Sequence, residues 1–168
     1  MVRSLEFFLV LVIEAPLSYY GVMKFSTRTR YGLRFLVYLT LQQGGRFVQL
    51  NEVAEAEGVS LKYLEHIVRQ LKPAGFIHSR RGAKGGYALA VDPAKTNLEE
   101  VFSCLEGDLA PIDCLEGERP DCPRHWRCST VELWRELEEH IRSFLRGYSL
   151  EDLAERIREG QGTEMFYI

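Results

Sequence analysis

Apolar residues recur at helical spacing in three consecutive segments of the chain. The first segment, Thr27–Gln43, predicts an amphipathic helix that Gly44-Gly45 ends. Leu50–Glu57 predicts a short second helix, and Leu61–Lys72 predicts a third after the turn at Gly58. Four apolar side chains of the third helix are expected to face inward: Leu64, Ile67, Val68 and Leu71. A short helix, a turn containing glycine and a second helix are typical of the helix-turn-helix motif.

A β-hairpin is predicted directly after the third helix. Phe76-Ile77 and Tyr87–Leu89 are short apolar runs that predict two strands. The predicted loop between them, Arg80–Gly86, is rich in glycine and carries three cations. Glycine lets a backbone approach another surface closely, so we interpret this hairpin as a cationic wing.

Three possible capping boxes divide the second half of the chain. Thr96–Glu99 predicts the start of a helix that runs to about Leu105, and Ser129–Glu132 predicts the start of a long helix, Thr130–Arg146. Ser149–Asp152 predicts a last short helix. The long helix carries a stripe of apolar residues three or four positions apart: Trp134, Leu137, Ile141 and Phe144. This stripe favours dimerisation, with packing against the chain's own head as the alternative.

These elements predict a mainly α fold with a small β-hairpin wing, in which a winged helix-turn-helix head precedes a long dimerisation helix. The expected division is an N-terminal extension at 1–22, a DNA-binding domain at 23–92, and a cysteine loop, dimerisation helix and tail at 93–168. The apolar run Phe7–Ile13 is far shorter than the roughly 20 residues of a membrane span. We expect Met23 to be the natural start and the protein to be cytoplasmic, with no membrane partner.

Charge is distributed unevenly along the 168 residues, whose net charge of −3 alone would argue against a nucleic-acid partner. Between Met23 and Ala90 there are 11 Lys and Arg against 4 Asp and Glu, a local charge of +7. From Val91 to Ile168 there are 9 against 18, a local charge of −9. A basic head on an acidic body fits a module that binds phosphates of double-stranded DNA.

The predicted DNA-reading surface combines the first turns of the third helix with the wing and the first helix. Its candidate contacts are Arg28, Ser60, Lys62, Tyr63, Glu65, Arg69, Arg80, Arg81 and Lys84. Glu65 can accept a hydrogen bond from the amino group of cytosine, whereas Lys62 and Arg69 suit phosphate or guanine. Tyr63 has partial packing in the core as an alternative role, and His66 is expected to be a polar surface residue.

Three of the four cysteines lie in one polar stretch, Asp113–Cys128, in which no apolar periodicity explains them. They are Cys114, Cys122 and Cys128. Thiolates gathered in one loop are the ligands of a soft metal or an iron–sulfur cluster. Zinc held with His125, a disulfide switch and a vestigial site are alternatives. Cys104 is expected to lie in the core of the preceding helix.

Four segments resemble the Rrf-type winged-helix repressors, whose branches include IscR, NsrR and CymR. They are MKFSTRTRYGLR (Met23–Arg34), SLKYLEHIVRQLKPAGFI (Ser60–Ile77), RGAKGGYALA (Arg81–Ala90) and LEGDLAPIDC (Leu105–Cys114). The resemblance implies a homodimer that binds a near-palindromic operator. It also implies that Glu65 reads a base and that Arg81 reads a groove.

The same resemblance implies that the three loop cysteines hold an iron–sulfur cluster of the 2Fe–2S type. One branch supplies the fourth ligand three residues after the last cysteine, where this chain has Val131. Another branch supplies an acidic residue from the first helix of the partner subunit, where this chain has Arg30. His125 is the nearest substitute. Weaker candidates are Asp113, Glu116 and Asp121.

The final residues, MFYI, resemble the C-terminus of the CymR branch. That resemblance implies a second possible partner, cysteine synthase, whose active site Tyr167-Ile168 would enter as a peptide mimic. The alternative is an apolar tail folded onto its own dimer. The sequence shows no nucleophile–base pair, phosphate loop or paired carboxylates, so it predicts a regulator and no enzyme.

Overall fold

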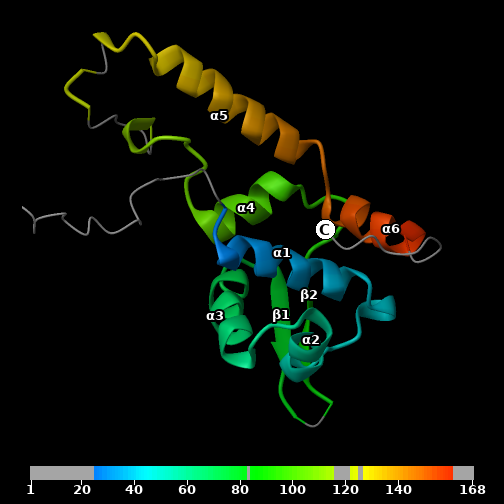
Figure 1. The fold of residues 1–168 in the computed structure, drawn as a ribbon. Coiled ribbons are helices and arrows are strands. Elements are labelled where there is room, and N and C mark those ends of the chain that lie inside the picture. The colour runs from blue at the N-terminus through cyan, green and yellow to red at the C-terminus, as the bar shows by residue number, and fades with distance from the viewer. Residues whose placement is uncertain (1–24, 83, 116–121, 125–126, 161–168) are drawn as a thin grey trace, which may run out of the picture.

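The computed structural model describes residues 25–82, 84–115, 122–124 and 127–160. The head contains α1 (Thr27–Thr40), α2 (Leu50–Glu57) and α3 (Leu61–Leu71), followed by the hairpin of β1 (Ile77–Arg80) and β2 (Gly86–Leu89). The second half contains α4 (Leu98–Glu106), α5 (Val131–Arg146) and α6 (Leu150–Gly160). Two 3₁₀ turns, Gln43–Gly45 and Asp113–Leu115, lie in the connections. The wing and α5 lie at opposite ends of the molecule (Figure 1).

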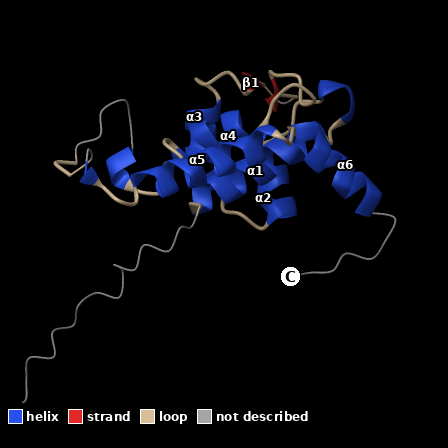
Figure 2. Cartoon of the chain, turned by 90° about the horizontal axis from the view of Figure 1, so that it is seen from above, coloured by secondary structure: helices blue, strands red, loops and turns tan. Residues whose placement is uncertain are grey.

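The core forms where α1 crosses the inner faces of α3, α4 and the hairpin. The four predicted inward residues of α3, Leu64, Ile67, Val68 and Leu71, are all buried. Seen from above, the helices crowd around α1, and α6 extends to one side (Figure 2). The described helices and the antiparallel β1–β2 pair confirm the predicted fold class. No helix in the described ranges has the length and apolar character needed to cross a bilayer.

The loop between α1 and α2 docks directly against the wing. Val48 and Tyr87 exchange two backbone hydrogen bonds of 2.8 Å, which adds a short bridge to the edge of β2. The carbonyl oxygen of Val48 would lie 2.3 Å from a Cβ atom at Gly86, whose φ is 142°. Only glycine fits this approach, so Gly86 fixes the loop against the base of the wing.

Several element boundaries differ from the sequence prediction. The first helix ends at Thr40, before the two glycines, because Gln43–Gly45 forms a separate 3₁₀ turn. The strands are longer than predicted, since Arg80 pairs with Gly86 in the antiparallel register.

Two of the three capping boxes are also wrong. Asn97 is the N-cap of α4 and accepts from the amide of Glu100, while the hydroxyl of the buried Thr96 donates to the carbonyl of Asp92. Thr130 precedes α5 without a side-chain cap. Ser149 and Asp152 do form a reciprocal box, with Ser149 Oγ accepting from the amide of Asp152 at 3.1 Å.

Candidate nucleic-acid interface and cysteine loop

The exposed face of α3 follows from how the helix begins and packs. Ser60 caps the helix, and its Oγ accepts from the amide of Tyr63 at 3.3 Å. The apolar face is buried against the core, so Lys62, Glu65 and Arg69 are exposed on the opposite side. His66 is exposed as well, as predicted for a polar surface residue. The polar face of α3 is therefore available to a ligand as large as duplex DNA.

Tyr63 divides its side chain between core and surface. Its ring is half-buried and meets Tyr31 edge to face, with ring centroids 5.9 Å apart. The guanidinium groups of Arg30 and Arg34 lie over the ring of Tyr31 at 5.1 and 5.4 Å. The predicted packing role of Tyr63 is thus present, and only the exposed part of its ring remains for DNA.

The wing carries three exposed cationic side chains. Arg81 and Lys84 are exposed at the tip of the hairpin, whereas Arg80 is held in place. Its guanidinium lies 4.1 Å from the ring centroid of Phe47, and its Nη2 donates to the carbonyl of Lys84 at 2.7 Å.

The structure brings α3 and the wing together around one open cavity of about 340 Å³. Glu65 lines it from α3, Gly82 and Gly85 line it from the wing, and Gln49 lines it from the start of α2. A side chain at position 85 would collide with the carbonyl oxygen of Arg80, 2.2 Å from the Cβ position. The glycines therefore keep the hairpin tight where it faces Glu65.

Arg28 lies apart from this surface. It is half-buried near the end of α4. Burial raises the pKa of Cys104 there, and the charge of Arg28 only partly opposes this rise. Burial would raise the pKa of Glu106 as well, but hydrogen bonds from Ser26 and Thr29 lower it, and the charge of Arg28 adds a smaller effect in that direction. The Nε of Arg28 is buried with no hydrogen-bond partner in the described part of the chain. Arg28 therefore faces α4 rather than the wing, and its contact with DNA stays a prediction.

Arg46 is a cation beside the wing that the sequence analysis did not select as a candidate. It lies in the α1–α2 loop and pairs with Glu52, which it contacts through two guanidinium nitrogens. The hydrogen bond from Arg46 is the main reason that the pKa of Glu52 lies below its ordinary value. In the sequence Arg46 stands between two glycines and Phe47, and this pattern does not predict which part of the fold the loop contacts.

The cysteine loop connects α4 to α5. Cys114 lies in the 3₁₀ turn Asp113–Leu115, and Cys122 and Cys128 lie further along; all three are half-buried free thiols. The hydroxyl of Thr130, 3.4 Å from the Sγ of Cys128, lowers the pKa of that thiol, and the backbone at Thr130 and Val131 lowers it further. This favours the thiolate, the form that binds metals.

The donor chemistry of the loop fits a soft metal or an iron–sulfur cluster, because three thiols are its chief ligating groups. Within the described ranges, however, no group of three His, Cys, Asp or Glu side chains is close enough to hold a metal ion. Three of the candidate further ligands, His125, Glu116 and Asp121, lie outside the described residues. Cys104 is separate from the loop, half-buried in α4, and burial raises the pKa of its thiol.

A family sequence model described as an iron-dependent transcriptional regulator, Rrf2, matches residues 25–156. That range includes the whole head, the cysteine loop and α5. The chain belongs to the Rrf2 family. Its described relatives are transcriptional regulators and not enzymes, as the sequence predicted.

Curated relatives match most of the chain. It is 38% identical over 131 residues to Protein rrf2 of Nitratidesulfovibrio vulgaris, covering 78% of this chain and 87% of that protein. The HTH-type transcriptional regulator CymR of Bacillus subtilis is 35% identical over 146 residues, 87% of this chain and 100% of the regulator. IscR of Xenorhabdus nematophila is 34% identical over 131 residues, 78% of this chain and 79% of its own length.

Solved structures of such regulators share the fold. CymR, the global cysteine regulator of B. subtilis, matches with a TM-score of 0.67 and 33% identity, over 80% of this chain and 98% of that one. The oxidized form of Staphylococcus aureus CymR matches with a TM-score of 0.61 and 33% identity, over 79% and 97%. These matches show that the Rrf2-family chain has the winged-helix architecture of its relatives.

Proposed function

We propose that this Rrf2-family regulator acts as a homodimer that reads an operator with α3 and the wing, and that its cysteine loop senses iron–sulfur, redox or sulfur status. The observation that supports DNA reading most directly is the shared cavity. Glu65 of α3 and the glycines of the wing line one hollow on the basic half of the chain. A base-reading helix and a flexible cationic hairpin can therefore engage one stretch of duplex.

The same proposal assigns Cys114, Cys122 and Cys128 to an iron–sulfur cluster of the 2Fe–2S type, with His125 as the candidate fourth ligand. The iron-dependent description of the family model and the IscR relatives support this assignment. A bound cluster would crosslink the loop, and oxidants or a shortage of iron would remove that crosslink. Zinc held by the same residues remains the less favoured alternative.

Signalling from the loop to the head would pass through ion pairs between α4 and α5. Arg142 of α5 reaches Glu99 of α4 and Asp108 after it, each at 3.2 Å. Ordering the loop between these helices would favour one arrangement of α5, and hence one spacing of the two heads in the dimer. The ligand of the cysteine loop can change DNA affinity only by the difference between its own binding free energies for the two arrangements of α5.

Selection of duplexes from a random library tests DNA reading. The wild-type protein is expected to enrich one near-palindromic sequence. Arg81→Ala is expected to lose about tenfold in affinity for the selected duplex, because a lost groove contact costs about 1–3 kcal/mol. Lys95→Ala is the matched control, since Lys95 is exposed and does not line this cavity. Equal affinity of Arg81→Ala and wild type at moderate salt would contradict the assignment of the wing.

Anaerobic purification tests the cluster. The wild-type protein is expected to show visible absorption together with iron and sulfide, and Cys122→Ser is expected to be colourless. Cys104→Ser is the matched control because Cys104 lies in α4, outside the loop, and it should keep the wild-type spectrum. A colourless wild-type protein that contains zinc would overturn the cluster assignment.

A cluster-free thiol switch is the second candidate, and the CymR relatives favour it. CymR of B. subtilis matches over its whole length, and a CymR of S. aureus has been solved in an oxidized form. In this case two loop cysteines would form a disulfide that changes DNA affinity, and the tail could bind cysteine synthase. Tyr167-Ile168 lies outside the described residues, so the tail remains a prediction from sequence. A disulfide detected by mass after mild oxidation, in cluster-free protein with altered DNA affinity, would favour the switch.

A further inference from the structure

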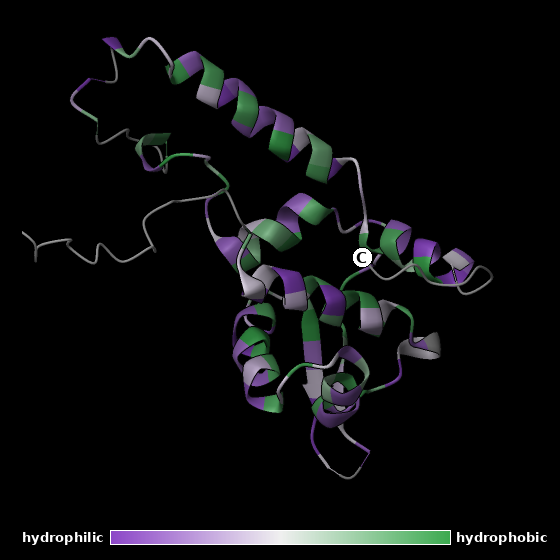
Figure 3. Ribbon diagram, viewed as in Figure 1, coloured by the Kyte–Doolittle hydropathy of each residue, from purple (hydrophilic) through white to green (hydrophobic). Residues whose placement is uncertain are grey.

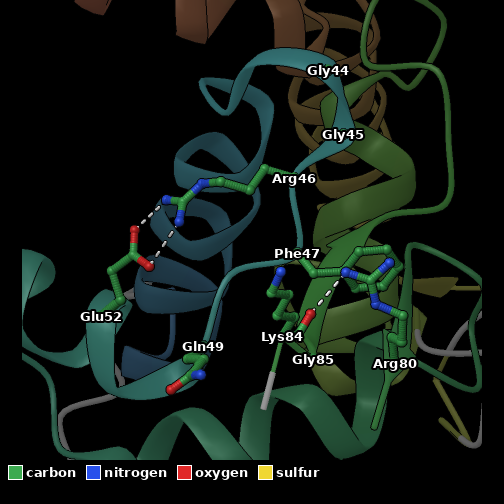
Figure 4. Close-up of a pocket in the computed structure, with 9 residues that line it drawn as sticks. All are labelled: Gly44, Gly45, Arg46, Phe47, Gln49, Glu52, Arg80, Lys84 and Gly85. Carbon is green, nitrogen blue, oxygen red and sulfur yellow. Dashed lines mark hydrogen bonds and ion pairs between the residues drawn. The ribbon is translucent and has the colours of Figure 1, made fainter. Parts of the chain in front are cut away.

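A second open cavity, of about 620 Å³, lies beside the base of the wing. The α1–α2 loop, the start of α2 and the wing line it, and no residue of α3 does (Figure 4). Gln49 and Gly85 line this cavity as well as the one that contains Glu65. The two cavities therefore adjoin, and a long ligand lying on α3 would continue into the second.

The walls of this cavity carry a net positive charge. Arg46, Arg80 and Lys84 contribute three cations, and Glu52 contributes one anion. Arg46 and Glu52 pair with each other, at side-chain exposures of 51% and 38%, so that both remain accessible to water. The close-up shows Arg46 on one wall and Arg80 on the other, with Lys84 between them (Figure 4).

The cation on the wing wall is fixed in position before any ligand arrives. The Arg80 guanidinium lies 4.1 Å from the ring centroid of Phe47 and donates to the carbonyl of Lys84 at 2.7 Å. Phe47 is itself held edge to face against His78, with ring centroids 5.1 Å apart. A planar guanidinium held in this way loses little entropy when it binds a phosphate through two N–H groups.

The geometry points to a phosphate-binding site: we propose that this cavity takes a backbone phosphate of the DNA whose bases α3 reads. The inference rests on the proposed DNA-binding function and adds a contact that carries no sequence information. Phosphate contacts of this kind set the register of a protein on the duplex, while base contacts specify the sequence. The α1–α2 loop would then bind DNA together with the wing against which it docks.

The salt dependence of binding tests the site. Affinity for a random-sequence duplex and for the selected duplex would be measured between about 50 and 200 mM salt. In the proposed homodimer each substitution removes one cation from both heads, so Arg80→Gln and Lys84→Gln are each expected to reduce the slope of log affinity against log salt by about 2, and to weaken both duplexes by the same factor. Lys95→Gln removes one charge away from both cavities and should leave the slope close to wild type. Slopes of Arg80→Gln and Lys84→Gln equal to the slope of this control would overturn the proposal.

Glu52 provides a test of opposite sign. Glu52→Gln removes the one anion among the lining residues, breaks its ion pair with Arg46 and can still accept from the hydroxyl of Tyr38. Arg46 keeps its hydrogen bond to Gln42, so the effect comes from loss of the negative charge. Glu52→Gln is expected to strengthen binding to both duplexes several-fold, whereas Arg46→Gln should weaken it. Unchanged or weaker binding by a folded Glu52→Gln variant would count against a phosphate in the cavity.

Two further experiments distinguish a free phosphate ion from a DNA phosphate, and the cavity assignment from the proposed DNA-binding function. Inorganic phosphate that stabilises wild-type protein against heat but not Arg80→Gln, with equal DNA slopes, would assign the site to a free anion and overturn the DNA contact. Replacing single phosphates of the selected duplex by neutral methylphosphonates should reveal one position in each half-site that weakens wild type but not Arg80→Gln. Wild-type protein that binds no duplex would overturn the proposed function itself, whereas sequence-specific binding with unchanged variant slopes would overturn only the cavity assignment.

Discussion

Glu106 joins the beginning of α1 to the end of α4. Its carboxylate accepts from the amide of Ser26 at 2.6 Å, from the hydroxyl of Ser26 at 2.5 Å and from the hydroxyl of Thr29 at 2.6 Å. Burial alone would raise the pKa of Glu106, but these hydrogen bonds outweigh it and hold the pKa below its ordinary value of 4.5. The ionised carboxylate therefore stabilises the fold at the place where the cysteine loop begins.

The stability of Glu106→Gln should depend on pH relative to wild type. A pKa lowered on folding gives stability that is complete above the ordinary value and is lost as pH falls through the folded value. At pH 7 the variant is expected to be less stable by about 1–2 kcal/mol, because hydrogen bonds to a charged group are lost. Urea unfolding should show this difference closing as pH falls below the ordinary value of 4.5 and through the lower pKa of the folded protein.

Glu55→Gln, at an exposed position of α2, is the control and should match wild type at both pH values. A stability difference at Glu106 that is the same at pH 7 and well below pH 4.5 would contradict an ionised carboxylate at this position.

Among the helices, strands and caps, the sequence correctly predicted those that depend on residues close together in the chain. The apolar period of α3 and the Ser149–Asp152 box depend on residues within one or two turns, and both were correct. Thr96 was mistaken for a cap because its burial and its bond to the carbonyl of Asp92 depend on packing. The strands were too short in the prediction because the added residues, His78–Arg80 and Gly86, are polar or glycine and join the strands only through cross-strand pairing.

In the candidate site as well, residues set by local sequence pattern were predicted, and contacts between distant segments were not. Glu65, Arg81 and the wing glycines could be chosen from sequence because they follow directly from the helix-turn-helix and hairpin pattern. Phe47 and Arg80 are 33 positions apart, and only the folded chain places the ring beneath the guanidinium. Arg46 was missed for that reason. The placement of Arg28 against α4 could not be predicted either, since both faces of the first turn of α1 carry polar residues.

At the scale of the whole molecule, α5 carries apolar side chains that the single chain does not cover. Leu133 is 59% exposed and Phe144 is 63% exposed, while Val131 and Leu145 near the two ends of the helix are buried. Apolar and polar residues alternate around the helix along its whole length (Figure 3). Of the predicted stripe, Trp134, Leu137 and Ile141 are half-buried and Phe144 is exposed. The contacts of Arg142 with Glu99 and Asp108 join α5 to α4 on another part of the helix. A second copy of the chain is the partner that the proposed homodimer supplies.

Leu133→Glu should therefore separate the proposed dimer without unfolding the head. A carboxylate placed against an apolar partner surface costs several kcal/mol to desolvate, whereas in the monomer this position is already in water. Sedimentation equilibrium is expected to show a dimer for wild type and a monomer for Leu133→Glu, with unchanged helical circular dichroism. Affinity for a two-half-site operator should fall at least tenfold, because the second head no longer binds as part of one molecule. Glu136→Gln, at another exposed position of α5, should remain dimeric, and a Leu133→Glu variant that also remains dimeric would exclude this part of the helix from the interface.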